Sequence, residues 1–279
     1  MFGDWLSKKV ENGDNNLVAI TPAMSEGSGM NDFAETNPDK FYDVAIAEQH
    51  SMTFAAGLAK EGKKPVLAIY STFLQRAYDQ LIHDVALQKL DVTLAIDRAG
   101  FVGGDGATHA GIFDVSFLRC IPNIIIMSPS DENECWKMLS TGYNYPGPAA
   151  IRYPRGEGPV AEISESFSSL EIGKARFINE VVSEFVIFSF GNMLSLSMEI
   201  ADTLNCSLVD MRFIKPLDEE LIEKCAKTYK HIISIEENVV TGGAGSAACC
   251  TRGGRPSRSS RPRRGTCSSR SRPPSSRQT

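Results

Sequence analysis

The sequence lacks any apolar run long enough to cross a lipid bilayer, which takes about 18 continuous apolar residues. Its first residues, MFGDWLSKKVENGD, also lack the apolar core of a secretory signal peptide. Both absences argue against a membrane protein or a secreted one. We therefore expect a soluble chain located in the cytoplasm, or in a plastid if a preceding segment carried a transit peptide.

Cysteine and histidine are few, with seven and four residues in a chain of 279. Cys120, Cys135, Cys206 and Cys225 stand singly in apolar or helical surroundings, without CxxC spacing or clustered histidines. Cysteines in this arrangement are more often buried thiols than disulfides or metal ligands. The sequence thus predicts no disulfide and no metal site built by this chain.

The end of the chain, 249–279, has no Ile, Leu, Val, Met, Phe, Tyr or Trp and no acidic residue or lysine, but nine arginines. The body before it carries 20 basic against 34 acidic residues. Such a tail cannot bury enough apolar surface to offset its chain entropy, so we predict that it is disordered. Arginines can bind nucleic acid through phosphates. The tail starts abruptly where a helix is expected, however, so a shift of reading frame is our preferred explanation.

The body is predicted to form two α/β domains, because short apolar strands alternate with helical segments. A hydrophobic content of 42% is ample for two buried cores. Residues 1–156 are expected to form a doubly wound, mostly parallel sheet. Its strands are predicted at 17–23, 41–47, 65–70, 92–96, 124–127 and 149–153, and its helices at 31–36, from Glu48 to 58, at 72–89, and after Ser130 as N-cap.

Residues 157–173 are polar and poor in aliphatic side chains, which is typical of a linker. A second, smaller α/β domain is predicted over 174–248. Its strands are expected at 185–190, 207–210 and 231–235, and its helices at 193–204 and 218–229. The turn at 241–246 should start another helix, but the apolar pattern stops there, so this domain is predicted to be truncated.

Polar and aromatic residues follow the predicted strands at the points where the strands end. They are Glu48, Gln49 and His50 after the second strand; Tyr70, Ser71, Thr72, Phe73 and Arg76 after the third; Asp97, Arg98, Asp105 and His109 after the fourth; and Arg152 and Arg155 after the last. Each alone has an ordinary explanation, such as a helix N-terminus for Glu48, a turn for Asp105 or a surface ion pair for Arg98. In a parallel sheet, however, the carboxyl ends of the strands share one edge. Together these residues predict a site, and Arg98 and Arg155 could clamp a phosphate there.

Five sequence runs carry a resemblance to a known family. They are AIAEQH (45–50), AIYSTFLQRAYDQ (68–80), AIDRAGFVGGDGATHAG (95–111), MSPSDENE (127–134) and RYPRG (152–156). From about Phe2 to Ser246 the chain resembles the pyrimidine-binding and C-terminal domains of 1-deoxy-D-xylulose-5-phosphate synthases. These are thiamine diphosphate enzymes of the transketolase superfamily. The run STFLQRAYDQ distinguishes this family from transketolase proper and from the β subunits of 2-oxoacid dehydrogenases.

The resemblance implies a role for each candidate residue. Glu48 matches the catalytic glutamate at N1′ of the cofactor's aminopyrimidine, and Phe73 matches the ring that packs on that pyrimidine. Tyr70 and Arg76 match the lining of the same pocket. Arg98 and Arg155 match the phosphate clamp for glyceraldehyde 3-phosphate. Asp105 and His109 match residues that contact the acceptor's oxygens and assist proton transfer.

The resemblance also implies partners. The family condenses pyruvate with glyceraldehyde 3-phosphate, with loss of CO2, to 1-deoxy-D-xylulose 5-phosphate, a precursor of isoprenoids, thiamine and pyridoxal. Its N-terminal domain holds the diphosphate through Mg2+, and the full enzyme is a homodimer. That domain's GDG motif is not matched here, because Gly104-Asp105-Gly106 lies in the acceptor loop. We therefore expect this chain to be inactive without that domain or a separate subunit.

Two other readings stay open at this point. A β-type subunit of a 2-oxoacid dehydrogenase is naturally separate from its α subunit, but it needs no phosphate clamp. A truncated product that acts only as an interaction module would need no catalytic set at all. The acceptor substrate distinguishes the synthase from the dehydrogenase subunit, since the synthase takes a phosphorylated aldose and the dehydrogenase takes a lipoyl domain.

Overall fold

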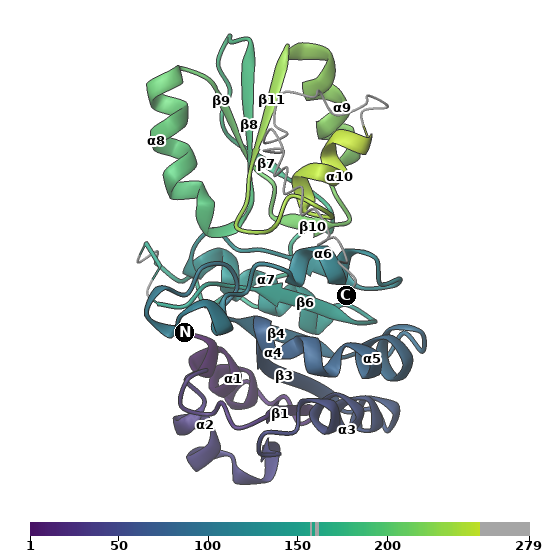
Figure 1. The fold of residues 1–279 in the computed structure, drawn as a ribbon. Helices are drawn as coiled ribbons and strands as arrows, with labels where there is room; N and C mark the ends of the chain where they lie inside the picture. Colours follow the sequence, from purple (N-terminus) through teal and green to yellow (C-terminus); the bar gives the residue numbers. More distant parts are fainter. Residues whose placement is uncertain (157, 160–161, 252–279) are drawn as a thin grey trace, which may run out of the picture.

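The computed structural model describes residues 1–156, 158–159 and 162–251. A larger α/β unit built on a seven-stranded sheet lies below a smaller one built on a four-stranded sheet (Figure 1). The predicted disordered tail lies outside the described residues from 252 onward. Its predicted start at Cys249 falls inside helix α10 (Ala244–Thr251), so the helix expected after the 241–246 turn does form.

The predicted doubly wound, mostly parallel sheet is confirmed. Its order is β10-β5-β6-β4-β3-β1-β2, and every neighbouring pair is parallel except β10 with β5. The strands are β1 (Leu17–Thr21), β2 (Phe41–Asp43), β3 (Lys64–Tyr70), β4 (Thr93–Asp97), β5 (Ile125–Met127), β6 (Ala149–Arg152) and β10 (Phe213–Lys215). Strands β1, β4 and β6 are buried along their whole length, as expected for a sheet covered on both faces.

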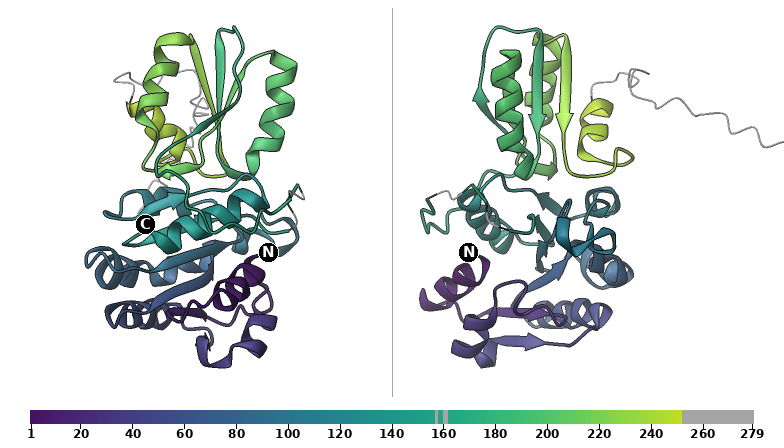
Figure 2. Two further views of the ribbon diagram at one scale, coloured as in Figure 1. Left: turned by 180° about the vertical axis from the view of Figure 1, so that it is seen from behind. Right: turned by 60° about the vertical axis from the view of Figure 1, so that its left-hand side comes forward.

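Helices cover both faces of this sheet (Figure 2). On one face α1 (Phe2–Glu11), α2 (Asn31–Thr36) and α7 (Glu132–Asn144) enclose a core that includes Trp5 and Trp136. On the other face α3 (Glu48–Lys60) and α6 (Asp114–Arg119) enclose a second core, which continues into the smaller unit. No helix in the described part of the chain is both long and apolar enough to span a bilayer.

The single helix predicted over 72–89 is instead a series of short turns. It consists of α4 (Ser71–Leu74), a 3-10 turn (Gln75–Ala77), α5 (Tyr78–Gln80) and a π turn (Leu81–Ala86). Ala77, Leu81 and Val85 are fully buried and stand four residues apart. A regular α-helix has about 3.6 residues per turn, so side chains spaced four apart would gradually turn away from the face that meets the core. The wider π turn keeps these side chains on the core.

The N-cap of α7 is also one residue later than predicted. The Asp131 carboxylate accepts a hydrogen bond from the Glu134 backbone N–H at 2.7 Å, which satisfies the helix N-terminus. Ser130, the predicted cap, instead donates its hydroxyl to Asp210 Oδ2 of the smaller unit at 3.2 Å. The local pattern SPSD fits either residue, and the long-range contact to Asp210 decides between them.

The smaller unit has a four-stranded sheet of order β11-β8-β9-β7. Its elements are β7 (Arg176–Asn179), β8 (Phe185–Ser189), α8 (Leu194–Leu204), β9 (Ser207–Asp210), α9 (Glu219–Thr228) and β11 (His231–Ile235). The sequence did not predict β7 or β10. Strand β7 is a partly exposed edge strand, and the three-residue β10 leaves the smaller unit to pair with β5 of the larger sheet. Short edge strands carry little apolar periodicity.

The predicted linker, 157–173, is partly outside the described residues. In its described part, the half-buried side chains of Ile163, Phe167 and Leu170 pack against the core beneath α1 and α7. The ring centroid of Phe167 lies 5.7 Å from that of Trp136. This segment therefore lies along the larger unit as it passes to the smaller one.

A buried ionic cluster joins the two units. Glu134 of α7, 1% exposed, lies 2.8 Å from Arg212 Nε and 3.3 Å from Arg176 Nη1, both of the smaller unit. Arg176 Nη2 also lies 3.0 Å from Oδ2 of the fully buried Asp210. Burial raises the pKa of Asp210, and the charge of Arg176 opposes that rise. Each buried carboxylate thus has an arginine partner, and the Glu134 pairs cross the junction.

We expect Glu134→Ala to lower the free energy of unfolding by roughly 3 kcal/mol, because it leaves two arginines facing buried surface without their shared carboxylate. Urea denaturation of the purified chain measures this loss. Glu223→Ala is the matched control, since its carboxylate is 62% exposed and pairs with Lys227 at 3.6 Å. That control should change stability by less than about 0.5 kcal/mol. Equal losses in the two variants would contradict a structural role for the cluster.

Candidate active site

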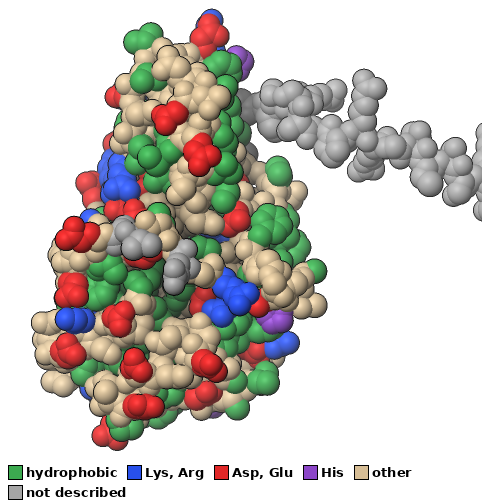
Figure 3. Space-filling view, turned by 90° about the vertical axis from the view of Figure 1, so that its left-hand side faces the viewer, with side chains coloured by type: hydrophobic (Ala, Val, Ile, Leu, Met, Phe, Trp, Pro, Cys, Tyr) green, Lys and Arg blue, Asp and Glu red, His purple; other side chains and the backbone are tan. Residues whose placement is uncertain are grey.

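Most of the predicted site residues lie at the carboxyl edge of the large sheet. Strands β6, β4, β3 and β1 are consecutive neighbours, and Tyr70 at the end of β3 pairs with Asp97 at the end of β4. The loops that follow these strands therefore emerge side by side. Basic, acidic and histidine side chains lie together at the surface of the larger unit (Figure 3).

Glu48 is the most deeply buried of the predicted site residues. It opens α3 after a turn in which Ala45 has a φ of 57°, and it is only 2% exposed. Arg76 Nη1 donates to its Oε1 at 2.5 Å, while the Arg76 side chain is 50% exposed. Among the described residues, no donor is hydrogen-bonded to Glu48 Oε2. One oxygen is therefore held in place by Arg76, and the other has no hydrogen-bond donor among the described residues.

Three aromatic rings, from the two segments that follow β3 and β4, lie near Arg76. Tyr70 and Phe73 are stacked, with centroids 5.9 Å apart and planes inclined by 12°. The His109 ring meets Phe73 edge-on at 5.4 Å, and the Arg76 guanidinium lies 4.8 Å from the Phe73 centroid. The structure thus joins the β3 loop to the loop after β4 through aromatic contacts.

The two predicted clamp arginines lie on either side of one carboxylate. Arg155 Nη1 is 2.8 Å from Asp105 Oδ1, and Arg98 Nε is 4.0 Å from Asp105 Oδ2. Arg98 also donates Nη1 to Asp97 Oδ2 at 2.7 Å and lies 4.1 Å from the Tyr70 ring centroid. An anion that bound both arginines would share them with Asp105 or displace it.

Asp97, the last residue of β4, is a buried acid that the sequence places at this edge without a specific role. Burial raises its pKa from the ordinary 3.8 to about 6, although the neighbouring Arg98 charge opposes the rise. Its Oδ1 accepts the Arg98 backbone N–H at 2.6 Å and its Oδ2 accepts the side chain. Arg98 has a φ of 55°, a conformation that L residues rarely adopt. Asp97 therefore holds Arg98 in a turned-back position over Tyr70.

Family comparisons agree with this arrangement. The model of the transketolase pyrimidine-binding domain matches residues 2–160, and that of the transketolase C-terminal domain matches residues 173–254. The chain belongs to the transketolase family. The bounds of the two matches coincide closely with the two structural units.

Curated relatives named 1-deoxy-D-xylulose-5-phosphate synthase refine this result. The proteins from Psychromonas ingrahamii and Hahella chejuensis are 58% and 59% identical to this chain over 88% of its length. The chain spans only 39% and 38% of the length of those two proteins. The resemblance to this synthase family inferred from the sequence is thus confirmed, over a minor part of its members' length.

Solved structures show the same fold. A split-gene transketolase, an inactive β4 tetramer, is similar with a TM-score of 0.80 at 28% identity, over 90% of this chain and 82% of that one. A transketolase from Campylobacter jejuni has a TM-score of 0.66 at 18% identity, over 90% of this chain and 44% of that one. The second likeness concerns the fold alone.

In this transketolase-family chain, Gly27 also contacts the candidate site residues. Arg98 Nη1 donates to the Gly27 carbonyl at 2.7 Å. A Cβ at Gly27 would stand 1.9 Å from the Tyr70 hydroxyl, so no other residue fits without displacing that ring. The turn containing Gly27 follows β1, whose carboxyl end lies on the same edge. The rule that located the other loops would have found it too.

Arg152 is not part of the exposed site, although it ends the strand, β6, that precedes Arg155. It is 3% exposed and pairs with the fully buried Asp114, with Nε 2.8 Å from Oδ2. Arg155, three positions later in the sequence, is 44% exposed. Gln49 and His50 are exposed, and His50 stacks on Phe54 of its own helix at 5.9 Å. Burial thus separates the two arginines, since Arg152 is enclosed and Arg155 is half-exposed.

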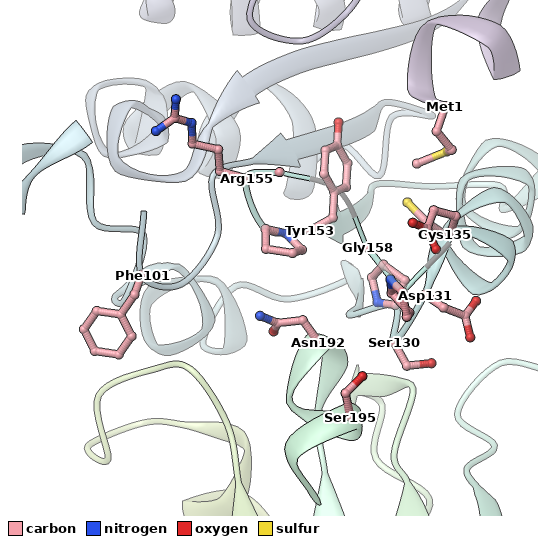
Figure 4. A pocket seen from close by; sticks show the side chains of 15 residues that line it. Met1, Phe101, Ser130, Asp131, Cys135, Tyr153, Arg155, Gly158, Asn192 and Ser195 are labelled. Carbon is pink, nitrogen blue, oxygen red and sulfur yellow. The ribbon is translucent and has the colours of Figure 1, made fainter. Parts of the chain in front are cut away.

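A pocket of about 810 Å³ lies next to the site, between the two units. Arg155 and Tyr153 line one side of it, and Asn192 and Ser195 of the smaller unit line the other (Figure 4). Of the predicted site residues, only Arg155 borders this pocket. The Glu48 carboxylate therefore belongs to a different surface of the same sheet edge.

The residues present fit one end of thiamine diphosphate. The buried Glu48 carboxylate, with no donor on its Oε2 among the described residues, suits a ring nitrogen that exchanges a proton. The stacked Tyr70 and Phe73 rings offer an apolar face for an aromatic ring. The described residues include no group of three or more His, Cys, Asp or Glu side chains placed to hold a metal ion. The fit is thus to the pyrimidine end of the cofactor.

The raised pKa of Asp97 makes a pH-dependent contribution to stability. In the folded chain the Asp97 carboxyl stays protonated up to about pH 6, whereas in the unfolded chain it loses its proton near pH 3.8. Its contribution to the free energy of unfolding is therefore full below pH 3.8 and is lost as the pH rises to about 6. We expect Asp97→Asn to abolish that loss. The free energy of unfolding of the variant minus that of the wild type should therefore rise by roughly 2 kcal/mol from pH 4 to pH 7.

Urea titrations at several pH values measure this difference. Asp202→Asn, at an exposed position of α8, is the matched control and should give a difference that stays flat. A flat difference for Asp97→Asn as well would contradict the raised pKa.

Proposed function

We propose that this chain forms the pyrimidine side of a thiamine diphosphate site. The complete site condenses pyruvate with D-glyceraldehyde 3-phosphate, with loss of CO2, to 1-deoxy-D-xylulose 5-phosphate. The observation that carries the proposal is the Glu48 carboxylate, buried at the sheet edge with one oxygen held by Arg76 and the other open. The identity of 58% to a curated synthase supports the choice of reaction within the family.

Glu48 moves a proton in this proposal. Its open Oε2 exchanges a proton with N1′ of the aminopyrimidine, and Arg76 keeps the carboxylate oriented for that exchange. Phe73, backed by Tyr70, packs on the pyrimidine and excludes water from it. Bound thiamine diphosphate supplies the nucleophilic carbon that attacks the pyruvate carbonyl and allows CO2 to leave.

The arginine pair binds the acceptor in this proposal. Arg98 and Arg155 lie within reach of one carboxylate, Asp105, so they can also share the oxygens of one phosphate. Asp105 and His109 lie in the same loop and contact the acceptor's oxygens, where they assist proton transfer. Before the acceptor arrives, Asp105 compensates the positive charges of the two arginines. The phosphate then replaces Asp105 as their partner.

The ligands of the diphosphate and Mg2+ come from a further domain or a separate subunit in this proposal, and the complete enzyme is a homodimer. The chain by itself is then inactive. A similar situation is known for the related split-gene transketolase, whose solved β4 tetramer is inactive. The described part of this chain offers no metal ligand cluster to replace such a partner.

The proposal predicts a gain of activity on completion of the chain. The purified chain with pyruvate, glyceraldehyde 3-phosphate, thiamine diphosphate and Mg2+ should give no product by chromatography. Joined to the segment of the Psychromonas ingrahamii synthase outside the matched region, it should form 1-deoxy-D-xylulose 5-phosphate. In that complete enzyme Glu48→Gln should lower kcat by about 10²–10⁴-fold, because the amide cannot exchange the proton.

Glu61→Gln, in the C-cap position of the same helix and exposed, is the matched control and should keep wild-type turnover. Product from the chain alone would overturn its predicted inactivity. Wild-type kcat in Glu48→Gln would overturn the role of that glutamate.

The acceptor tests the phosphate clamp. In the complete enzyme, Arg155→Ala should raise KM for glyceraldehyde 3-phosphate by about 10–100-fold, the effect of losing a charge-assisted contact. Unphosphorylated D-glyceraldehyde serves as the internal control, since its KM should not change. Transfer to a lipoyl domain in place of the aldose would instead support a 2-oxoacid dehydrogenase β subunit. Equal effects on both aldehydes would contradict a clamp.

A further inference from the structure

The loop that carries Asp105 and His109, here called the acceptor loop (98–111), is closed at its neck by two glycines. Gly100 N–H donates to Gly111 O at 2.7 Å, and Gly111 N–H donates back to Gly100 O at 2.8 Å. Between them the backbone forms only two three-residue 3-10 turns. Asp105 and His109 are therefore positioned through this neck rather than through a regular element.

A segment of the smaller unit packs on that neck. The backbone N–H of Val239 donates to Ile112 O at 3.0 Å, directly after Gly111. The Glu237 side chain covers Gly100 so closely that a Cβ there would lie 2.2 Å from Glu237 Oε2. Gly100 also has a φ of 84°, so both its backbone and its surroundings require glycine. The supporting segment, residues 236–243, thus contacts both sides of the neck.

Glu237 is itself held from two directions. Asn192 Nδ2, at the start of the α8 region, donates to Glu237 Oε2 at 2.8 Å. The backbone carbonyl of Glu237 accepts a hydrogen bond from Arg152 Nη2 at 3.2 Å. The same Arg152 nitrogen lies 3.4 Å from Gly111 O, so one buried guanidinium contacts both the supporting segment and the neck.

The rest of the supporting segment is anchored on α6 of the larger unit. Ser116 Oγ donates to Thr241 O at 2.7 Å, and Arg119 Nη1 donates to Gly242 O at 2.9 Å. Glu236 caps α10 by accepting the Ala244 N–H at 2.9 Å. Both ends of the segment are therefore fixed, and Glu237 between them cannot withdraw from Gly100 without breaking other contacts.

We propose that Glu237 and Arg152 are positioning residues through which the smaller unit sets the geometry of the acceptor loop. This inference rests on the proposed function, since it assigns the loop's order to acceptor binding. A loop that samples other conformations binds its ligand more weakly, in proportion to the fraction of time spent in the competent one. The smaller unit therefore controls acceptor affinity without contacting the acceptor.

Hydrogen–deuterium exchange on the chain itself tests the first half of this proposal. Glu237→Ala should speed exchange of peptides covering 99–112 by about tenfold, because the neck opens more often. Glu237→Gln keeps an acceptor for Asn192 and should exchange as the wild type does. Glu223→Ala, which has the same charge change on an exposed face of α9, is the control, and peptides from β3 report that the fold is intact. Unchanged exchange in Glu237→Ala would overturn the proposal.

Kinetics of the complete enzyme test the second half. Glu237→Ala should raise KM for glyceraldehyde 3-phosphate about tenfold and leave KM for pyruvate unchanged, whereas Glu237→Gln should restore both. Unchanged acceptor KM in Glu237→Ala, in an active enzyme, would overturn the positioning role. A wild-type enzyme without condensation activity would overturn the proposed function instead, and the exchange experiment would still report on the loop.

Discussion

A guanidinium buried at the carboxyl edge of the large sheet requires partners on every side, and Arg152 finds them in three different parts of the chain. The Asp114 carboxylate at the start of α6 compensates its charge, with contacts of 2.8 and 3.2 Å. Its Nη2, which also donates to Asp114, reaches Gly111 O of the acceptor loop and Glu237 O of the smaller unit. Loss of any one partner would leave part of a charge unsolvated. The requirement therefore holds the sheet edge, the loop and the smaller unit together.

Charges at the exposed site follow a different principle. Arg98 and Arg155 face Asp97 and Asp105, so the two positive and two negative groups balance in the absence of a ligand. Arg155 and Asp105 are partly exposed, and solvent screens their attraction enough for an incoming anion to compete. Asp97 is buried and keeps its hold on Arg98. One arginine thus pairs with a buried carboxylate, whereas the other pairs with a partly exposed one.

The two units are less separate than the alternation of strands and helices implies. Strand β10 belongs to the chain of the smaller unit but pairs with β5 of the larger sheet. The Glu134 cluster and the supporting segment add ionic and hydrogen-bonded contacts on two sides of the junction. One apolar core also runs from beneath α3 and α6 into the smaller unit. Together these contacts give the smaller unit a direct mechanical connection to the site.

Local patterns located many of the strands and helices, although not β7 or β10, and they led to candidate residues for the site. The apolar periods locate β1, β3, β4, β9, β11 and α2 within a few residues, because buried faces impose a period of two or of about 3.6 on the side chains. The positions of Glu48, Phe73 and Arg98 follow from the rule that parallel strands end at one edge. The family resemblance rests on long runs in those same loops.

Tertiary contacts decided the rest. Arg152 and Arg155 stand three positions apart at the end of β6, and only packing makes the first buried and the second half-exposed. Ser130 and Asp131 are both good helix caps, and Asp210 of the distant smaller unit selects between them. The roles of Gly27 and Glu237 depend on which side chain lies against which backbone. Burial and contact between distant segments leave no periodic trace in a sequence, because they arise only when the chain has folded.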